Sequence, residues 1–226
     1  MGTVADRLEL MAEKARKTLA AKDAARERAL QLCREVIRYS TNAIRAVHRG
    51  EYEEAKELLA SARLLLKDLD KTLSEHQELL DAGFVYNAQK EYAEGCITQA
   101  LIAGSTFPDP DELGISYAAY LNGLGEAVGE LRRHLLDCTR RGEISRCEEL
   151  LATMDDIYGV LVTMDFPDAI TGGLRRTTDI VRGILEKTRG DLTLSFRQRE
   201  LEEKLEAFEE RLGIRTTESF EKEESS

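Results

Sequence analysis

Residues 117–141 read YAAYLNGLGEAVGELRRHLLDCTRR, and this stretch decides the class of fold. It contains no proline and no alternating strand pattern, and Gly142 follows its last two arginines, as is typical of a helix end. Three glycines fall within seven residues, at Gly123, Gly125 and Gly129, and each weakens a helix by roughly 1 kcal/mol relative to alanine. We therefore predict a helix over 117–141 in which the glycines allow a ligand or another backbone to approach closely.

The rest of the chain continues the helical pattern. The predicted helices cover residues 4–48, 52 to a break near 83, 84–103, 117–141, 145–164, 168–188 and 196–212. Glycine or proline stands at the breaks, most clearly in GSTFPDPDELG at 104–114 and in Gly190-Asp191. No strand-like alternation and no repeat of solenoid period occurs. The sequence therefore predicts an all-α bundle of seven helices in one domain over 1–215, followed by a polar, disordered tail over 216–226.

The composition agrees with helices and narrows the class of protein. Of 226 residues, 33% are charged, three are proline and none is tryptophan. The formal net charge of −11 argues by itself against a nucleic-acid-binding protein, because such proteins usually show a basic face. Residues 200–226, however, hold ten glutamates against four basic residues, which places −6 of this charge at the C-terminal end. The remaining chain carries only −5.

Cysteine and histidine usage argues against disulfides and against a zinc site. The four cysteines form no CxxC pair, and the three histidines are scattered through the chain. The sequence also shows no secretory signal and no apolar stretch of membrane length. We expect reduced, mostly buried thiols in a cytoplasmic protein that does not span a membrane.

Two pairs of glutamates stand out as candidate metal ligands. Glu91 and Glu94 are three residues apart, and Glu126 and Glu130 are four residues apart, so each pair shares one face of its helix. Carboxylate oxygens suit hard cations such as Mg²⁺ and Mn²⁺. Two facing helices that each supply two such carboxylates can hold one or two metal ions. Two metal ions held side by side can promote hydrolysis of a phosphodiester. Four clustered negative charges repel one another, so we expect an empty site to be unstable or protonated.

Spacing alone leaves a simpler interpretation open. The chain has 43 acidic residues, and glutamate pairs at helical spacing arise often on solvated helix faces. The apolar residues that flank both pairs favour a metal site only modestly.

Several blocks of the sequence together resemble the translin and translin-associated factor X family. The resemblance extends over roughly residues 26–197. The blocks are the run from Arg26 to Ile37, His48-Arg49-Gly50-Glu51, Lys90 to Glu94, Tyr120-Leu121-Asn122-Gly123 with Gly129-Glu130-Leu131, and Tyr158-Gly159.

The resemblance implies a seven-helix protomer of the translin type that assembles into a hollow, closed, roughly octameric shell around RNA. It also implies that the four glutamates match the catalytic acids of the translin-associated factor X branch, a Mg²⁺- or Mn²⁺-dependent endoribonuclease. The translin branch has apolar residues in place of the first acidic pair, so this chain resembles the catalytic branch. One departure is that the family has an aspartate where Glu126 stands here, and glutamate is one methylene longer.

Basic residues close to these acids are candidates for binding the phosphate backbone of RNA. Lys90 directly precedes the first acidic pair, and four arginines follow the second pair on the same predicted helix. These arginines are Arg132, Arg133, Arg140 and Arg141. His134, four residues after Glu130, is a weaker candidate for supporting the metal site.

The sequence thus predicts a metal-dependent endoribonuclease that cleaves single-stranded or small duplex RNA inside a homo-oligomer, with or without a related second subunit. The alternative is a non-catalytic translin-type subunit that binds RNA or DNA, which would not need Glu91 and Glu94. A ferritin-like di-iron protein would need two Glu-x-x-His motifs, and the chain has none.

Overall fold

The computed structural model describes residues 3–80 and 82–212, and within these ranges it contains no strand. Its elements are α1 (Val4–Arg49), α2 (Tyr52–Leu73), the 3-10 turn η1 (Gln77–Leu79), α3 (Gly83–Ala103), α4 (Pro110–Leu113), α5 (Tyr117–Arg141), α6 (Ile144–Val162), α7 (Asp168–Thr171) and α8 (Leu174–Leu212). The all-α prediction is confirmed, and the helix predicted over 117–141 is α5 with the same bounds. The predicted tail over 216–226 lies outside the described residues.

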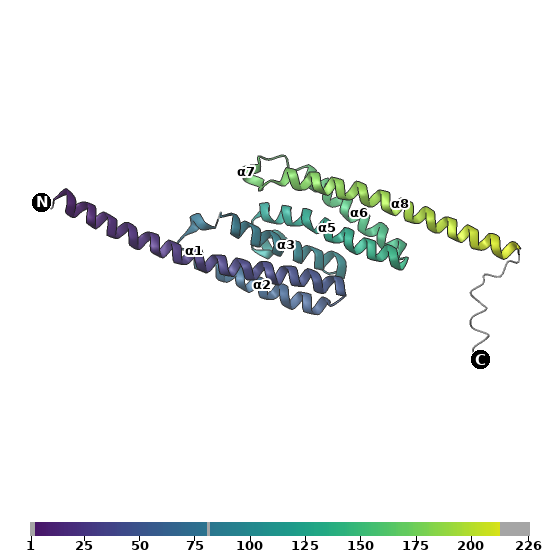
Figure 1. Ribbon diagram of the computed structural model, residues 1–226, viewed down its shortest axis with the longest axis horizontal. Coiled ribbons are helices and arrows are strands. Elements are labelled where there is room, and N and C mark those ends of the chain that lie inside the picture. The colour runs from purple at the N-terminus through teal and green to yellow at the C-terminus, as the bar shows by residue number, and fades with distance from the viewer. Residues whose placement is uncertain (1–2, 81, 213–226) are drawn as a thin grey trace.

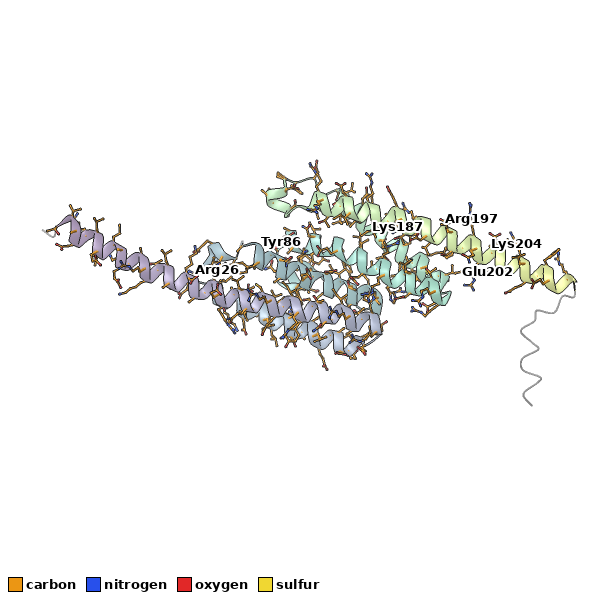
Figure 2. All side chains as sticks on the ribbon, viewed as in Figure 1. Arg26, Tyr86, Lys187, Arg197, Glu202 and Lys204 are labelled. Atoms are coloured by element: carbon orange, nitrogen blue, oxygen red, sulfur yellow. The ribbon has the colours of Figure 1, made fainter. Side chains whose placement is uncertain are left out.

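The helices stack in an order that makes α5 the centre of the molecule. Helix α1 packs on α2 and α3, α3 packs on α5, and α5 also contacts α6 and α8 (Figure 1). The first part of α1 and the last part of α8 project from opposite ends of this stack, and Arg197, Glu202 and Lys204 stand on the projecting part of α8 (Figures 1 and 2). No helix in the described ranges is long and apolar enough to cross a membrane.

The core is built from one apolar stripe of each long helix. In α1 the buried stripe begins only at Ala29, which is why the preceding turns project from the bundle. Among the fully buried side chains are Leu32, Leu69, Ile97, Leu131, Met154 and Leu185, which come from six different helices. Burying a side chain of this size contributes about 1.5–3 kcal/mol, so the packing of these stripes, rather than helix propensity, fixes the fold.

The helix ends follow the signals in the sequence. At the start of α5 the Ser116 hydroxyl accepts a hydrogen bond from the Ala119 backbone N–H, which satisfies one of the free donors of the first turn. At its end Gly142 adopts φ +75°, a left-handed conformation that favours glycine, and its N–H bonds the carbonyls of Cys138 and Thr139.

The prediction of a helix break at Gly190-Asp191 was wrong. Helix α8 runs without interruption through these residues. The helix predicted over 168–188 does start at Asp168, but only as the short α7, which ends at Thr171 before Gly172 and Gly173. Gly190 costs a helix only roughly 1 kcal/mol. Tertiary contacts outweigh this cost, because Leu192 is buried in the core and Asp191 binds the guanidinium of Arg132 on α5 at 2.6 Å.

The glycines of α5 allow α3 to approach very closely. A Cβ atom added at Gly123 would lie 2.7 Å from the Lys90 carbonyl oxygen and 2.7 Å from the Ala93 Cβ. Gly125 lies directly against the Thr177 methyl group of α8, whereas a Cβ at Gly129 would meet nothing within 4 Å. The prediction of a close backbone approach is therefore confirmed for Gly123, and this contact brings the turn of α3 that carries Glu91 and Glu94 against α5.

Two alanine substitutions test whether this contact holds the bundle together. Gly123→Ala should destabilise the protein by about 1–3 kcal/mol, because its Cβ overlaps a backbone oxygen that cannot move without separating α3 from α5. Gly129→Ala, in the same helix but facing open space, should leave stability unchanged or raise it by up to about 1 kcal/mol. Chemical denaturation measures both free energies of unfolding. Equal effects of the two substitutions would contradict the close approach.

Candidate metal centre

Three of the four predicted glutamates converge where α3 meets α5. Glu91 and Glu94 come from adjacent turns of α3, Glu126 comes from α5, and one carboxylate oxygen of each lies within 4.8 Å of the other two. All three side chains are partly buried. Among the described residues this is the one group of three or more acidic, histidine or cysteine side chains with such spacing. We call Glu91, Glu94 and Glu126 the glutamate cluster.

The electrostatics of the glutamate cluster are those of crowded negative charge. Burial raises the pKa of Glu94 to about 8, and the neighbouring carboxylates of Glu126, Glu91 and Glu130 add to this effect. Burial also raises the pKa of Glu91, against the opposing charge of Lys90. The Glu94 carboxyl is therefore held largely protonated at neutral pH in the absence of a cation.

The donor set of the glutamate cluster fits a hard divalent ion. Oxygen ligands at about 2.1 Å from Mg²⁺ are separated by roughly 3–4 Å, so oxygens already within 4.8 Å of one another need only small side-chain shifts to share one ion. Three carboxylates supply the charge and the hardness that Mg²⁺ and Mn²⁺ prefer. A cation would also favour the ionised form of Glu94, which burial disfavours.

The fourth predicted glutamate, Glu130, lies outside the cluster and has a partner of its own. Its Oε2 atom accepts a hydrogen bond from His48 Nε2 on α1 at 2.5 Å, and this bond lowers the pKa of Glu130. Its charge nevertheless raises the pKa of Glu94, which places it near the cluster. Its role as a ligand stays a prediction.

His48 is the site residue that sequence reasoning missed. Its side chain is only 5% exposed, and its second ring nitrogen, Nδ1, is buried without a hydrogen-bond partner among the described residues. The sequence pointed instead to His134, whose ring centroid lies 6.5 Å from that of His48. Since 82 residues separate His48 from Glu130, no local spacing could reveal the pair.

Lys90 faces the glutamates. Its ammonium group donates a hydrogen bond to Glu126 Oε1 and lies 3.9 Å from Glu91 Oε1, and its side chain is 16% exposed. It therefore offsets part of the negative charge of the glutamate cluster. A contact with RNA phosphate stays a prediction for this residue.

The four predicted arginines lie in different surroundings. Arg132 joins α5 to α8, because its guanidinium donates to Thr188 and Asp191. Arg133 is exposed, and its Nη1 lies 3.8 Å from Glu130 Oε2, so it stands next to the candidate site.

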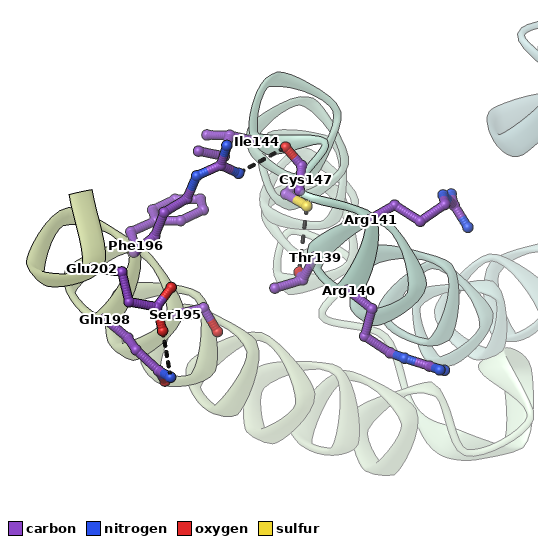
Figure 3. A pocket seen from close by; sticks show the side chains of 11 residues that line it. Thr139, Arg140, Arg141, Ile144, Cys147, Ser195, Phe196, Gln198 and Glu202 are labelled. Carbon is purple, nitrogen blue, oxygen red and sulfur yellow. Dashed lines mark hydrogen bonds between the residues drawn. The ribbon is translucent and has the colours of Figure 1, made fainter. Parts of the chain in front are cut away.

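Arg140 and Arg141 lie at the far end of α5, about 20 Å along the helix from Glu126 at 1.5 Å per residue. There they line a cavity of about 660 Å³ between α5, α6 and α8 (Figure 3). Arg140 pairs with Asp137 and Arg141 with Glu143. RNA binding by these arginines also stays a prediction.

The raised pKa of Glu94 makes stability depend on pH in a defined direction. Between pH 4.5, the ordinary pKa of glutamate, and about 8, the unfolded chain releases a proton at Glu94 that the folded chain retains, so folding stability falls as pH rises. In EDTA, Glu94→Gln should raise the melting temperature, and by more near pH 8 than near pH 5. Glu57→Gln on the exposed face of α2 is the control. Circular dichroism measures the transitions, and a difference that does not change with pH would refute the assignment.

Comparison with known proteins supports the assignment of the fold. No family model matches the chain. An uncharacterised protein of Methanocaldococcus jannaschii, MJ0175, is 32% identical over 189 residues, which cover 83% of each chain. The solved structure of AfC3PO in complex with duplex RNA is 34% identical, has a TM-score of 0.75, and is matched over 84% of this chain and 98% of its own.

A second C3PO structure supports the fold alone. Apo-NeC3PO has a TM-score of 0.69 and 21% identity, over 86% of this chain and all of its own. Identity above 30% to AfC3PO over nearly its whole length shows that the chain belongs to the translin and translin-associated factor X family, the family of the C3PO components.

Proposed function

We propose that this protein is a metal-dependent endoribonuclease that binds RNA inside a closed oligomer. The observation that carries the proposal is the convergence of Glu91, Glu94 and Glu126 on one point between α3 and α5. Burial and the charges of neighbouring carboxylates raise the pKa of Glu91 and of Glu94, which costs stability, so a structural role alone does not account for the cluster.

The similarity to AfC3PO supports RNA as the substrate, because that protein was solved in complex with duplex RNA. The net charge of −11 does not oppose this, since the excess of glutamate over residues 200–226 lies on and beyond the projecting end of α8 in the sequence. We favour the catalytic branch of the family over the translin branch, because this chain has the first acidic pair, Glu91 and Glu94, which the translin branch lacks.

Each residue of the site has a defined task in the proposed reaction. Glu91, Glu94 and Glu126 hold Mg²⁺ or Mn²⁺, which when bound lowers the pKa of water and stabilises the charge of a leaving oxygen. Glu130 is held by His48 at the edge of the cluster as an ionised carboxylate, so it is suited to accept the proton of the attacking water. Lys90 next to Glu126 and Arg133 next to Glu130 supply positive charge for the phosphates of the strand.

The projecting ends of α1 and α8 support self-association. Both carry apolar side chains at helical spacing that stay exposed in one protomer, and exposed apolar stripes of this kind usually mark contact surfaces. They are Val4, Leu8, Met11 and Leu19 on α1, and Leu194, Leu201, Leu205 and Phe208 on α8. A closed oligomer built through these ends would repeat the glutamate cluster once in every protomer.

Glu94→Gln tests the proposed reaction, because it keeps the size of the side chain and removes a ligand charge. We expect cleavage of labelled RNA in Mg²⁺ or Mn²⁺ to fall by about 100-fold or more, since even residues that only support a metal ligand are worth 10–100-fold. RNA binding should be retained, because the substitution removes negative charge. Glu57→Gln on α2 should cleave as wild type does.

Two outcomes decide against the proposal. Cleavage by the wild-type protein that persists in excess EDTA would rule out a metal mechanism. Tight RNA binding without cleavage under any metal would instead identify a non-catalytic translin-type subunit, or one that needs a second kind of subunit.

A further inference from the structure

A second feature lies directly beside the glutamate cluster. A cavity of about 440 Å³ opens between α3, α5, the turn that joins α7 to α8, and the first part of α8. Lys90 and Glu126 line this cavity and also belong to the candidate metal centre, so the two sites share one wall. The size lies within the range of pockets that hold small ligands.

The walls of this cavity are held in place by hydrogen bonds that join α3 and α5 to α7, to α8 and to the turn between them. On one side the hydroxyl of Tyr86 on α3 donates to the Gly172 carbonyl at 3.3 Å. On the other side the buried Asn122 donates to the Thr171 carbonyl at 2.7 Å and accepts from the Thr177 hydroxyl at 2.6 Å. The cavity is therefore formed before any ligand binds.

The packing of Tyr86 explains part of the loop sequence Thr171-Gly172-Gly173. A Cβ atom at Gly172 would lie 2.6 Å from the Tyr86 ring, so only glycine leaves the ring in its place. Gly172 and Gly173 also have φ values of +62° and +86°, a region that other residues rarely adopt.

One cation at the rim of the cavity has no acidic partner. Arg176 is exposed and forms no ion pair with any other described residue, whereas its neighbour Arg175 binds Asp165 at 3.1 Å and lies outside the cavity. Asn87 also lines the cavity, and its amide forms no hydrogen bond to another residue in the described ranges. The side chain of Ile180 adds an apolar surface that is 54% exposed.

This combination of groups matches the parts of a nucleotide. A guanidinium without a carboxylate partner suits a phosphate, to which it can donate two hydrogen bonds. A free amide can bond a base edge or a ribose hydroxyl, and an aliphatic side chain can cover the face of a base. Lys90 is bonded to Glu126, so its charge serves the phosphate at the site of cleavage, and within the cavity Arg176 is the cation free to bind a second phosphate.

We infer that this cavity binds one nucleotide of the RNA strand, the one next to the phosphodiester held at the glutamate cluster, with its phosphate on Arg176. The inference rests on the proposed function and names the part of the substrate that the protein would grip beside the site of cleavage. The phosphate is either an internal phosphodiester or the terminal phosphate of a strand end.

Equilibrium binding of RNA in EDTA tests this without any need for cleavage. The probe is a short single-stranded RNA with a fluorescein at its 3′ end, prepared with a 5′-phosphate and with a 5′-hydroxyl, and anisotropy is followed over a range of salt concentrations. Arg176→Ala should weaken binding by about tenfold and lower the slope of log affinity against log salt by roughly 0.7, as expected for one lost phosphate contact on a single strand. Asn87→Ala should weaken binding by a few-fold with an unchanged slope. Arg175→Ala, the matched control, should bind within about twofold of wild type.

The two probes and the three variants distinguish the possible results. A loss in Arg176→Ala that is equal for both probes indicates an internal phosphodiester, and a loss confined to the 5′-phosphorylated probe indicates a strand end. If Arg176→Ala and Arg175→Ala behave alike, or if Asn87→Ala binds as wild type does, the cavity does not bind a nucleotide and the inference is overturned. If the wild-type protein itself fails to bind RNA, the proposed function falls, and with it the inference.

Discussion

The close contact between α3 and α5 at Gly123 is the constraint on which the rest of the structure depends. No side chain fits between this residue and the Lys90 carbonyl, so the two helices touch through their backbones. Glu91 is the residue after Lys90, and Glu94 follows about one helical turn later. Glu126 lies about one helical turn after Gly123. The same contact that fixes the packing of the central helices therefore also determines that carboxylates from both helices meet.

In the site, repulsion between carboxylates opposes the apolar packing of the helices that carry them. Burial and repulsion from neighbouring carboxylates raise the pKa of Glu94 to about 8. At the edges Lys90 pairs with Glu126, and the hydrogen bond from His48 stabilises the ionised form of Glu130. This packing consists of the apolar stripes of α1, α3, α5 and α8. Their burial stabilises the fold by far more free energy than the crowded carboxylates cost. Such stored repulsion is typical of a site that binds a cation, because the cation relieves it.

Whether a feature could be predicted from the sequence depends on how far apart in the chain the interacting residues lie. Helix bounds such as 117–141 and same-face glutamate pairs depend on residues a few positions apart, so local spacing predicts them well. Three hydrogen-bonded contacts join residues 56 to 86 positions apart, and no local pattern encodes them. They are the contacts of His48 with Glu130, of Arg132 with Thr188 on α8, and of Tyr86 with Gly172. The unbroken course of α8 through Gly190 has the same origin, since Asp191 and Leu192 are held by other helices.

The central claim is that the carboxylates of α3 and α5 share a divalent ion, and anomalous diffraction from crystals grown or soaked in Mn²⁺ tests it most directly. We predict an anomalous peak between Glu91, Glu94 and Glu126, at about 2.0–2.2 Å from an oxygen of each, with the Lys90 ammonium displaced from or sharing the Glu126 carboxylate. The Glu94→Gln variant should lose the peak or show it at reduced occupancy. A wild-type crystal with ordered glutamates and no anomalous density at this point would contradict the account.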